Sequence, residues 1–380
     1  MTNMDTKTPV ALIPCDSYDE DKVYESIVKA IELIGGIETL INKEEKILVK
    51  PNLLNGVDPS KTVTTNPAVF DAVLRYLKEK GYTNITYGDS PAGISNMEEV
   101  VKVTKLKERA DKYDVRLGDF DNYQTMDNPS GNVAKKFALC KGVIDADAII
   151  SISKMKTHAL ENITGAVKNQ YGCIWANKKS LGHAKYPNSN IFAQMLVDLN
   201  LYLKPRLYIM DGIIAMEGNG PASGDPVFMK VILVSKDPVA LDSVFSRLID
   251  LNPEYVPTIL YGDKYKLGTM TNIKVLTPNE ELTLDEAFNK YGNPNFKVNR
   301  NKRSFWNIKE LLHRAKKKTH KPVVDLDLCV ACGKCENACP VDGKAVHSGN
   351  GKKASYDYNK CIRCYCCQEI CPAKAISRKG

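Results

Sequence analysis

Two runs of four cysteines with identical spacing lie near the C-terminal end of the chain. Each run reads Cys-x2-Cys-x2-Cys-x3-Cys and is followed directly by proline. This spacing is typical of [4Fe–4S] ligation in two-cluster ferredoxins, where the fourth cysteine of each run ligates the other cluster. The chemistry it indicates is one-electron transfer. We therefore assign one cluster to Cys329, Cys332, Cys335 and Cys371, and the other to Cys361, Cys364, Cys367 and Cys339.

Cys366 stands next to Cys367 and is a second candidate for the third ligand of the second run. We assign the ligand to Cys367, because it has the same spacing to Cys371 that Cys335 has to Cys339. Three other interpretations stay open: a disulfide framework, zinc sites, and one run that has lost its cluster. A pair of [4Fe–4S] clusters accounts for the third cysteine and the proline of each run, which zinc does not require.

A second set of polar residues follows four short apolar runs in the N-terminal two-thirds of the chain. Lysines close together favour an anionic ligand, a phosphate or a carboxylate. Four residues could also hold a divalent cation through carboxylate or amide oxygens: Asp89, Asp211, Asn52 and Glu217. We expect three catalytic candidates, with the histidine as proton donor: Lys156, His158 and Asp89. We expect the ligand-binding residues to be Lys50, Asn52, Lys154, Asp211, Glu217 and Asn219.

Each of these residues also has a structural interpretation, because aspartate caps helices and turns and a lysine can simply be solvated. The segment from Thr164 to Gly172 adds small residues that allow close backbone approach, and His183 is a second acid–base candidate. A hydrogen-bonded structural histidine is as good an explanation for either histidine alone. There is no Gly-x-Gly-x-x-Gly or Walker-type motif to indicate a nucleotide.

The elements that must position these residues alternate between short apolar runs and amphipathic stretches. The pattern predicts strands over 10–13, 46–49, 84–87, 148–153, 207–210 and 227–234. It predicts helices over 21–34, 67–80, 97–107, 191–203, 239–249 and 255–261. This alternation predicts an α/β fold with an open, mostly parallel sheet. Ligands of such sheets bind beyond the carboxyl ends of the strands, where the polar residues gather.

The length and composition fit an ordinary globular protein with one large and one small domain. The chain has 380 residues, of which 43% are hydrophobic, and no apolar stretch is long enough to span a bilayer. We therefore expect a cytoplasmic protein without a membrane partner. Because exposed clusters decay in oxygen, we also expect an anaerobic or microaerobic host.

The formal net charge of +8 is concentrated in one segment. Residues 297–321 hold ten basic residues and one glutamate, which gives 10 − 1 = +9. Because each cluster with its four thiolates adds negative charge, a nucleic-acid partner is not indicated. We expect a linker helix over 306–317. The segment could also steer an acidic redox partner towards the clusters.

The residues quoted above resemble a family known as domain of unknown function 362, which is often fused to a two-cluster ferredoxin. The similarity lies in Lys50-Pro51-Asn52, Gly88-Asp89-Ser90, Lys154-x-Lys156-Thr157-His158, the Thr164–Gly172 segment, Asp211-Gly212-Ile213 and Glu217–Pro221. The Cys366-Cys367 pair and Glu369 also resemble the ferredoxin tail of the family. The resemblance implies the architecture and a site, and it implies no particular reaction.

The sequence thus predicts an α/β domain over 1–296, a basic linker over 297–321 and an α+β ferredoxin-like domain over 322–380. The first functional hypothesis is an oxidoreductase that relays low-potential electrons from two [4Fe–4S] clusters to a small anionic substrate or cofactor in the α/β crevice. The second is an electron-transfer adaptor that docks a partner enzyme. The third is a metallocofactor maturation factor.

Overall fold

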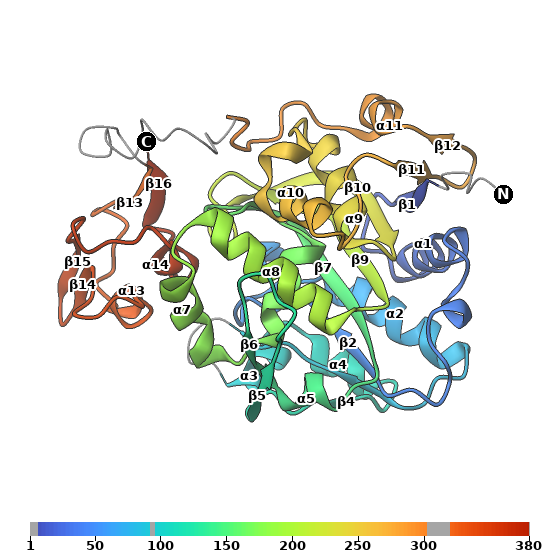
Figure 1. Ribbon diagram of the computed structural model, residues 1–380, viewed down its shortest axis with the longest axis horizontal. Helices are drawn as coiled ribbons and strands as arrows, with labels where there is room; N and C mark the ends of the chain where they lie inside the picture. Colours follow the sequence, from blue (N-terminus) through green and yellow to red (C-terminus); the bar gives the residue numbers. More distant parts are fainter. Residues whose placement is uncertain (1–6, 92–95, 302–319, 380) are drawn as a thin grey trace.

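The computed structural model describes residues 7–91, 96–301 and 320–379. A ten-stranded sheet forms the centre of the larger part (Figure 1). In spatial order its strands are β12 (Glu281–Leu282), β11 (Ile273–Leu276), β1 (Thr8–Pro14), β10 (Asp225–Ser235), β9 (Leu207–Glu217), β7 (Ala148–His158), β2 (Ile47–Lys50), β3 (Ile85–Tyr87) and β4 (Arg116–Leu117), with β8 (Asn162–Thr164) paired to β7.

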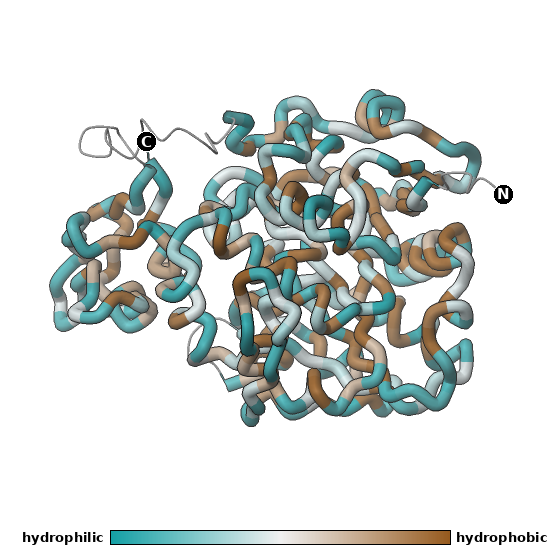
Figure 2. Tube along the Cα trace, in the orientation of Figure 1, coloured by the Kyte–Doolittle hydropathy of each residue, from teal (hydrophilic) through white to brown (hydrophobic). Residues whose placement is uncertain are grey.

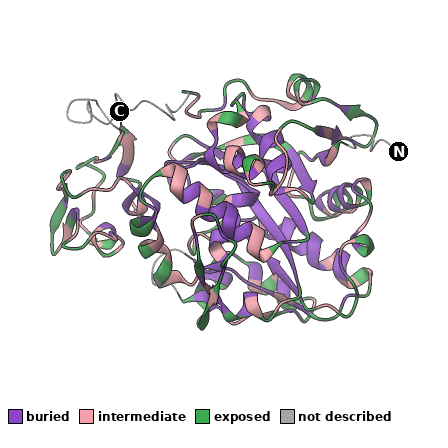
Figure 3. Ribbon diagram, viewed as in Figure 1, coloured by how far each residue is buried: buried purple, intermediate pink, exposed green. Residues whose placement is uncertain are grey.

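The run β9–β7–β2–β3–β4 is parallel throughout, and β1 and β11 are also parallel. Strand β10 lies antiparallel between β1 and β9. The predicted open, mostly parallel α/β fold is therefore confirmed. The parallel strands β2, β7 and β9 are buried along almost their whole length, as expected when helices cover both faces of a sheet. Figure 3 shows these central strands as the most continuously buried part of the chain.

Two helical layers enclose the sheet, because alternate side chains of each strand point to opposite faces. Along β1, Ala11 and Ile13 join one core while Val10 and Leu12 join the other. The first core is completed by α1 (Glu20–Leu33), α2 (Pro67–Glu79), α3 (Met97–Val103) and α4 (Leu106–Asp111). The second is completed by α6 (Ala166–Asn169), α8 (Ser189–Leu203), α9 (Pro238–Leu248) and α10 (Pro257–Lys264). Figure 2 shows the apolar segments of the trace concentrated in these strands and helices.

The helix starts follow from local sequence. Asn66 caps α2 and Asp237 caps α9, each by accepting a hydrogen bond from a backbone N–H of the first turn, and each is followed by proline. Thr283 and Glu286 form a capping box at the start of α11 (Leu284–Tyr291). The remaining elements of this part are β5 (Tyr123–Asp127), β6 (Lys136–Cys140), α5 (Lys141–Ile144), α7 (Ala176–Lys185) and four 3-10 turns, η1 (Ile37–Thr39), η2 (Pro59–Lys61), η3 (Gln170–Cys173) and η4 (Pro253–Tyr255).

Some predicted boundaries are wrong. Strands β7 and β9 continue through His158 and Glu217, beyond the predicted ends at 153 and 210, so the polar residues there lie on the strands themselves. The predicted helix 97–107 is two helices, because Lys105 has a positive φ of 60° between α3 and α4. The helix predicted over 255–261 starts at Pro257.

The C-terminal part is a small α+β unit beside the large sheet domain (Figure 1). Strands β13 (Lys321–Val324) and β16 (Ile376–Lys379) pair antiparallel, as do β14 (Val346–Gly349) and β15 (Lys352–Tyr356). Two short helices, α13 (Lys334–Asn337) and α14 (Cys366–Glu369), each start within one cysteine run and end just before its last cysteine. The predicted linker helix over 306–317 lies outside the described residues. Among the residues described, none of the helices has the length and apolar character needed to cross a membrane.

Candidate functional site

The C-terminal unit contains two small cavities, each lined by four cysteines. Cys329, Cys332, Cys335 and Cys371 surround one cavity. The other is lined by Cys339, Cys361, Cys364 and Cys367. The grouping is the one that the spacing predicted, with the fourth cysteine of each run crossing to the other cavity. Cys366 lines neither of them.

Hydrogen bonds to the cysteine sulfurs show that the residues present fit a cluster. The backbone N–H of Ala354 donates to Cys329 Sγ at 3.4 Å, and that of Ala345 donates to Cys339 Sγ at 3.3 Å. The Tyr356 hydroxyl donates to Cys367 Sγ at 3.2 Å. Donors aimed at sulfur stabilise the anionic ligands of an iron–sulfur cluster. The two cavities therefore have the ligands and the surrounding donors that such clusters require.

Lys50 and Asp89 form a buried ion pair at the carboxyl edge of β2 and β3, with Nζ and Oδ1 3.0 Å apart. The Asp89 carboxylate also accepts the backbone N–H groups of Leu53, at 2.6 Å, and Ser90, at 2.9 Å. Gly172 packs directly against the pair: a Cβ there would lie 1.7 Å from Asp89 Oδ1 and 2.6 Å from Lys50 Nζ. The sequence predicted that Lys50 and Asp89 would both lie at the carboxyl edge of the sheet. In the structure they form an ion pair there.

Lys156 lies in a neighbouring network without a carboxylate partner in hydrogen-bond contact. Its Nζ donates to Asn52 Oδ1 at 2.8 Å and to the Val63 carbonyl at 2.7 Å. Asn52 in turn donates through Nδ2 to Asn169 Oδ1 at 3.1 Å. Burial lowers the pKa of Lys156 well below its usual range, and the nearby charge of Lys168 lowers it further. Lys156 is therefore a buried residue that fixes the orientation of the Asn52 side chain.

Lys154 and Asp211 form a separate buried pair, with Nζ and Oδ2 2.8 Å apart. The Tyr18 hydroxyl donates to Asp211 Oδ1 and accepts from Lys154 Nζ, both at 2.8 Å. The backbone N–H of Asn66, the cap of α2, also donates to Asp211. Burial lowers the pKa of Lys154, while the charge of Asp211 opposes that shift. These contacts fix the strands to the first helical layer.

The predicted cation ligands Asp89, Asp211, Asn52 and Glu217 are not brought together. Asp89 and Asp211 are each engaged by a lysine, and Glu217 accepts from the backbone N–H of Lys297 at 2.8 Å. Among the described residues there is no group of three or more His, Cys, Asp or Glu side chains placed to hold a single metal ion. This finding does not bear on the two cysteine cavities. The four cysteines of a [4Fe–4S] cluster each bind a different iron atom, so their sulfurs lie further apart than the ligands of a single ion.

His158 connects the two parts of the molecule. Its Nε2 lies 2.9 Å from Glu369 Oε1 on α14, and its Nδ1 accepts the backbone N–H groups of Leu160 and Glu161. Burial lowers the pKa of His158 to about 3, so the ring is neutral and Nε2–H donates to the carboxylate. Burial alone would raise the pKa of Glu369, but His158 and the charge of Lys168 outweigh it and lower that pKa.

The predicted proton-donor role of His158 therefore does not suit this geometry, because both ring nitrogens are already engaged. Other contacts join the same two parts. Asn219 accepts a hydrogen bond from Gln368 Nε2 and donates to the Ile376 carbonyl at 3.0 Å. Arg378 Nη1 donates to the Ala159 carbonyl at 2.7 Å. The predicted ligand residue Asn219 is thus part of the domain contact.

We predict that His158→Ala destabilises the holoprotein by about 1–3 kcal/mol, because it leaves the Glu369 carboxylate buried without its main donor. His158→Gln, which keeps an N–H donor, should recover part of this loss. The matched control is His347→Ala on the exposed strand β14, which should cost less than about 0.5 kcal/mol. Chemical unfolding of the three variants measures the effect. Equal stability of His158→Ala and wild type would contradict the structural role.

A pocket of about 400 Å³ lies between the sheet domain and the C-terminal unit. The sheet domain contributes the polar residues Asn52, Asp89, Ser90, Thr164, Lys168, Asn169, Tyr171, Lys179 and His183. The C-terminal unit contributes Lys334, Asn337 and Ala338 from the first cysteine run, and Cys366, Glu369 and Ile370 from the second. We call this cavity the interdomain pocket. Its volume falls in the range typical of small-molecule sites.

Two residues that affect the charge of the interdomain pocket, Lys179 and His183, are not among the predicted catalytic or ligand-binding residues. Lys179 donates to the Ser90 carbonyl, and its enclosure lowers its pKa to about 8. Burial lowers the pKa of His183 to about 4, so the ring is neutral near pH 7. The ring stacks on Phe192, with centroids 4.3 Å apart. The pocket thus presents ammonium groups and a neutral imidazole.

Six further pocket residues lay in segments that the sequence had marked. Five belong to the 164–172 segment, and His183 was an acid–base candidate: the five are Thr164, Lys168, Asn169, Tyr171 and Gly172. Lys179 was missed, because helix α7 has no clear apolar stripe and was not predicted. Of the predicted site residues, Asn52 and Asp89 line the interdomain pocket, whereas Lys50, Lys154, Lys156, His158, Asp211, Glu217 and Asn219 do not.

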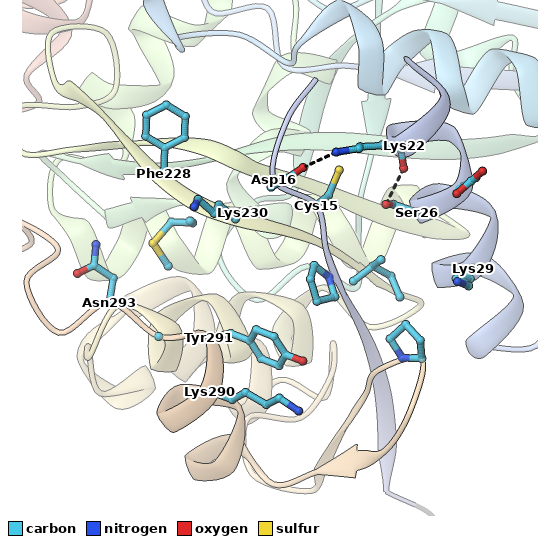
Figure 4. A pocket seen from close by; sticks show the side chains of 16 residues that line it. Cys15, Asp16, Lys22, Ser26, Lys29, Phe228, Lys230, Lys290, Tyr291 and Asn293 are labelled. Carbon is cyan, nitrogen blue, oxygen red and sulfur yellow. Dashed lines mark hydrogen bonds and ion pairs between the residues drawn. The ribbon is translucent and has the colours of Figure 1, made fainter. Parts of the chain in front are cut away.

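A larger hollow of about 840 Å³ lies between β1, α1, β10 and the end of α11 (Figure 4). Its rim carries charges that are already paired, such as Lys22 with Asp16 at 3.2 Å and Lys290 with Glu280. None of its lining residues comes from the C-terminal unit. It therefore offers no route between a bound molecule and the cysteine cavities.

An open α/β domain followed by a cysteine-rich unit with two cavities, each lined by four cysteines, defines a ferredoxin-type iron–sulfur protein. Residues 47–247 match a family model described as a domain of unknown function (DUF362), and residues 321–372 match a 4Fe-4S dicluster domain. The chain belongs to the DUF362 family. Its dicluster domain indicates iron–sulfur cluster binding and electron transfer.

Known proteins with detectable similarity include one curated relative. A thylakoid-associated protein of Synechocystis sp. is 33% identical over 262 residues, which cover 68% of this chain and 80% of that protein. Among solved structures, the lactate racemase apoprotein from Thermoanaerobacterium thermosaccharolyticum is similar at 12% identity and a TM-score of 0.42, over 66% of this chain and 59% of that one. A Thermotoga maritima protein is similar at 15% identity and a TM-score of 0.35, over 59% of this chain and 57% of its own.

Proposed function

We propose that the protein is an iron–sulfur oxidoreductase in which two [4Fe–4S] clusters exchange low-potential electrons with a small anionic ligand in the interdomain pocket. The observation that carries the proposal is the shared wall of that pocket. Cys366 stands beside the ligand Cys367, Ile370 precedes Cys371, and Ala338 precedes Cys339. A bound molecule would therefore touch segments that hold both cysteine cavities.

The clusters and the residues of the interdomain pocket have separate roles in this proposal. A [4Fe–4S] cluster, when bound, supplies or accepts one electron at a time. Lys168, Lys179 and Lys334 give the pocket positive charge that favours an anion. Asn52 and Asn169 add a polar wall whose amides are held by each other, by Lys156 and by Ser151, and Leu53 and Ile370 exclude water from part of the ligand surface. The proposal also includes the predicted domain boundaries, with the α/β domain over 1–296, the linker over 297–321 and the ferredoxin-like domain over 322–380.

The experiment is native mass spectrometry of protein purified without oxygen, followed by reduction and addition of the retained compound. We expect a mass excess of two cubanes plus a small molecule, and reoxidation of the reduced protein when more of that molecule is added. The Lys168→Ala variant should lose the small molecule, while Lys185→Ala, on the exposed part of α7, should retain it. Two cubanes, no retained molecule and no reoxidation by small anions would contradict the proposal.

The affinity for an anion should fall as the pH rises, because Lys179 loses its charge above its pKa of about 8. For a ligand that requires the charged form, the dissociation constant should rise about tenfold between about pH 7 and about pH 9. Sulfate is a suitable probe, because its own charge is constant over this range. Calorimetric titration of the holoprotein at both pH values measures the change, and Lys179→Met should remove it. A pH-independent affinity in wild type would exclude Lys179 from binding.

A second function, an electron-transfer adaptor for an acidic redox partner, is favoured by one surface observation. Three large apolar side chains flank the cysteine run of the first cavity: Leu326, Leu328 and Val330 are 52%, 51% and 65% exposed. Cys332 is also exposed. A partner protein that reoxidises the reduced clusters in the absence of any small molecule would favour this function over the first.

We also infer a cytoplasmic setting with little oxygen. The supporting observation is that the cysteines outside the two runs, Cys15, Cys140 and Cys173, are buried and free. Reduced thiols are usual in the cytosol, and cubanes persist best there when oxygen is scarce. Fractionation of cells into membrane and soluble parts, followed by detection of the protein, tests this setting.

A further inference from the structure

Buried polar atoms without partners gather at the interdomain pocket. Ser90 Oγ, Thr164 Oγ1 and His183 Nδ1 are all shielded from solvent and make no hydrogen bond. All three residues line this one cavity. Buried polar groups in native structures are almost always paired, because an unpaired group has lost its hydration without compensation. Three such atoms at one cavity indicate a ligand that supplies their partners.

Two of these atoms belong to residues that line the pocket together with Lys168. Thr164 ends β8, and Lys168 follows it on α6. No hydrogen bond or ion pair joins the Lys168 ammonium to any described residue. Its charge lowers the pKa of both His183 on α7 and Glu369 on α14, so the ammonium group lies within electrostatic range of both residues. We call Thr164, Lys168 and His183 the Lys168 corner.

The nearby carboxylate does not neutralise this corner by direct contact. Glu369 is held by His158 at 2.9 Å, and this bond lies at the domain contact. Two other charged groups of the pocket differ in this respect, because Lys179 already donates to the Ser90 carbonyl and Asp89 is paired with Lys50. The Lys168 corner therefore combines a cation with a hydroxyl and an imidazole that have no protein partners.

We propose that the Lys168 corner binds an oxyanion group of the pocket ligand. The ammonium of Lys168 and the hydroxyl of Thr164 would donate to its oxygens, and the neutral imidazole of His183 would complete the site. This inference rests on the proposed function, since it assumes a ligand in the interdomain pocket, and it names the chemical group by which that ligand is held. Carboxylates, phosphates and sulfates share this chemistry.

The experiment measures oxyanion binding to the anaerobic holoprotein by calorimetry, with sulfate, inorganic phosphate and acetate as probes. We expect Lys168→Ala to weaken the binding of the best probe at least tenfold. Lys185→Ala, which removes an exposed lysine of α7 outside the pocket, should leave it unchanged. The ranking of the three probes distinguishes a carboxylate site from a phosphate or sulfate site. Absence of binding by all three, or equal binding by Lys168→Ala, would overturn the proposal.

A second variant covers the case in which Lys168→Ala fails to fold. Thr164→Val keeps the volume of a side chain whose hydroxyl has no protein partner, so its folded state should be intact. It should still weaken the best probe severalfold if the hydroxyl binds the oxyanion. Iron content and unfolding curves verify that each variant is assembled. Wild-type affinity in an assembled Thr164→Val protein would remove the hydroxyl from the site and overturn the proposed corner.

Cys366 provides a readout that does not depend on turnover, because its side chain lines the same pocket. The bound probe should slow alkylation of Cys366 by iodoacetamide in wild type but not in Lys168→Ala. Sulfate that binds but leaves the alkylation rate unchanged would place the anion elsewhere and overturn the proposal. If an oxyanion protects Cys366 but no such compound reoxidises the reduced clusters, the proposed function fails while this site stands. If a small anion reoxidises the reduced clusters but binds to Lys168→Ala and to Thr164→Val as tightly as to wild type, this site fails while the proposed function stands.

Discussion

Replacing Cys367 by serine should remove about half of the iron of the holoprotein, whereas replacing the adjacent Cys366 should remove none. Cys367 lines a cavity with Cys339, Cys361 and Cys364, and its sulfur accepts a hydrogen bond from Tyr356. Cys366 lines the interdomain pocket instead. Iron and sulfide analysis of both variants, purified without oxygen, measures the difference.

Two control results decide whether the assignment holds. Cys15→Ser, which changes a buried thiol of the sheet domain, should keep the full iron content. Loss of iron in Cys366→Ser together with retention in Cys367→Ser would reverse the assignment of the ligand. A cluster that survives in both variants would mean that either cysteine can bind it. We do not expect this result, because Cys367 lines the cavity and Cys366 does not.

Replacing Gly172 by alanine should destabilise the sheet domain by about 3 kcal/mol or more. The new methyl group would overlap Asp89 Oδ1 and approach Lys50 Nζ, which both lie in a closely packed interior. Separating a buried ion pair leaves two poorly solvated charges, and this costs several kcal/mol. Crowding a packed interior adds to the cost. The free energy of unfolding in urea measures the effect.

Gly118→Ala is the matched control, because its new methyl group would come no closer than 3.3 Å to a neighbouring atom. It should cost much less than Gly172→Ala. The Gly172 variant should also bind the pocket ligand more weakly, since Asp89 orients Ser90 and Leu53 in the pocket wall. Wild-type stability in Gly172→Ala would mean that the backbone can move away from the pair, and the pair would then not be rigidly held.

The sequence predicted the sheet and the cysteine grouping well, because both depend on short-range patterns. Apolar runs such as the one before Lys50 are long enough to identify buried parallel strands. The position of the pocket depends instead on how two distant segments meet. Nothing in the spacing of Glu369 indicates that it would reach His158, which is 211 residues earlier in the chain.

The predicted lysines were misplaced for a related reason. Lys154 and Lys156 were expected at the open end of a strand, but β7 continues past them and β8 covers that end. Their side chains therefore lie in the interior, where burial lowers their pKa. Lys179 could not be predicted, because α7 is held against the pocket by tertiary contacts such as the one from the Tyr171 hydroxyl to the Lys179 carbonyl.

Tyr365 stands between Cys364 and Cys367, which line the second cysteine cavity, yet it is 4% exposed and belongs to the main core of the sheet domain. The hydrophobic interior of the sheet domain is therefore completed by a residue that is synthesised after every strand and helix of that domain. Because domains form from the N-terminus as the chain emerges, the sheet domain keeps an incomplete face until the cysteine-rich unit has been made. Delivery of iron to this unit and closure of the core then become a single maturation step, so cells short of iron should accumulate a chain that proteases recognise as incompletely folded.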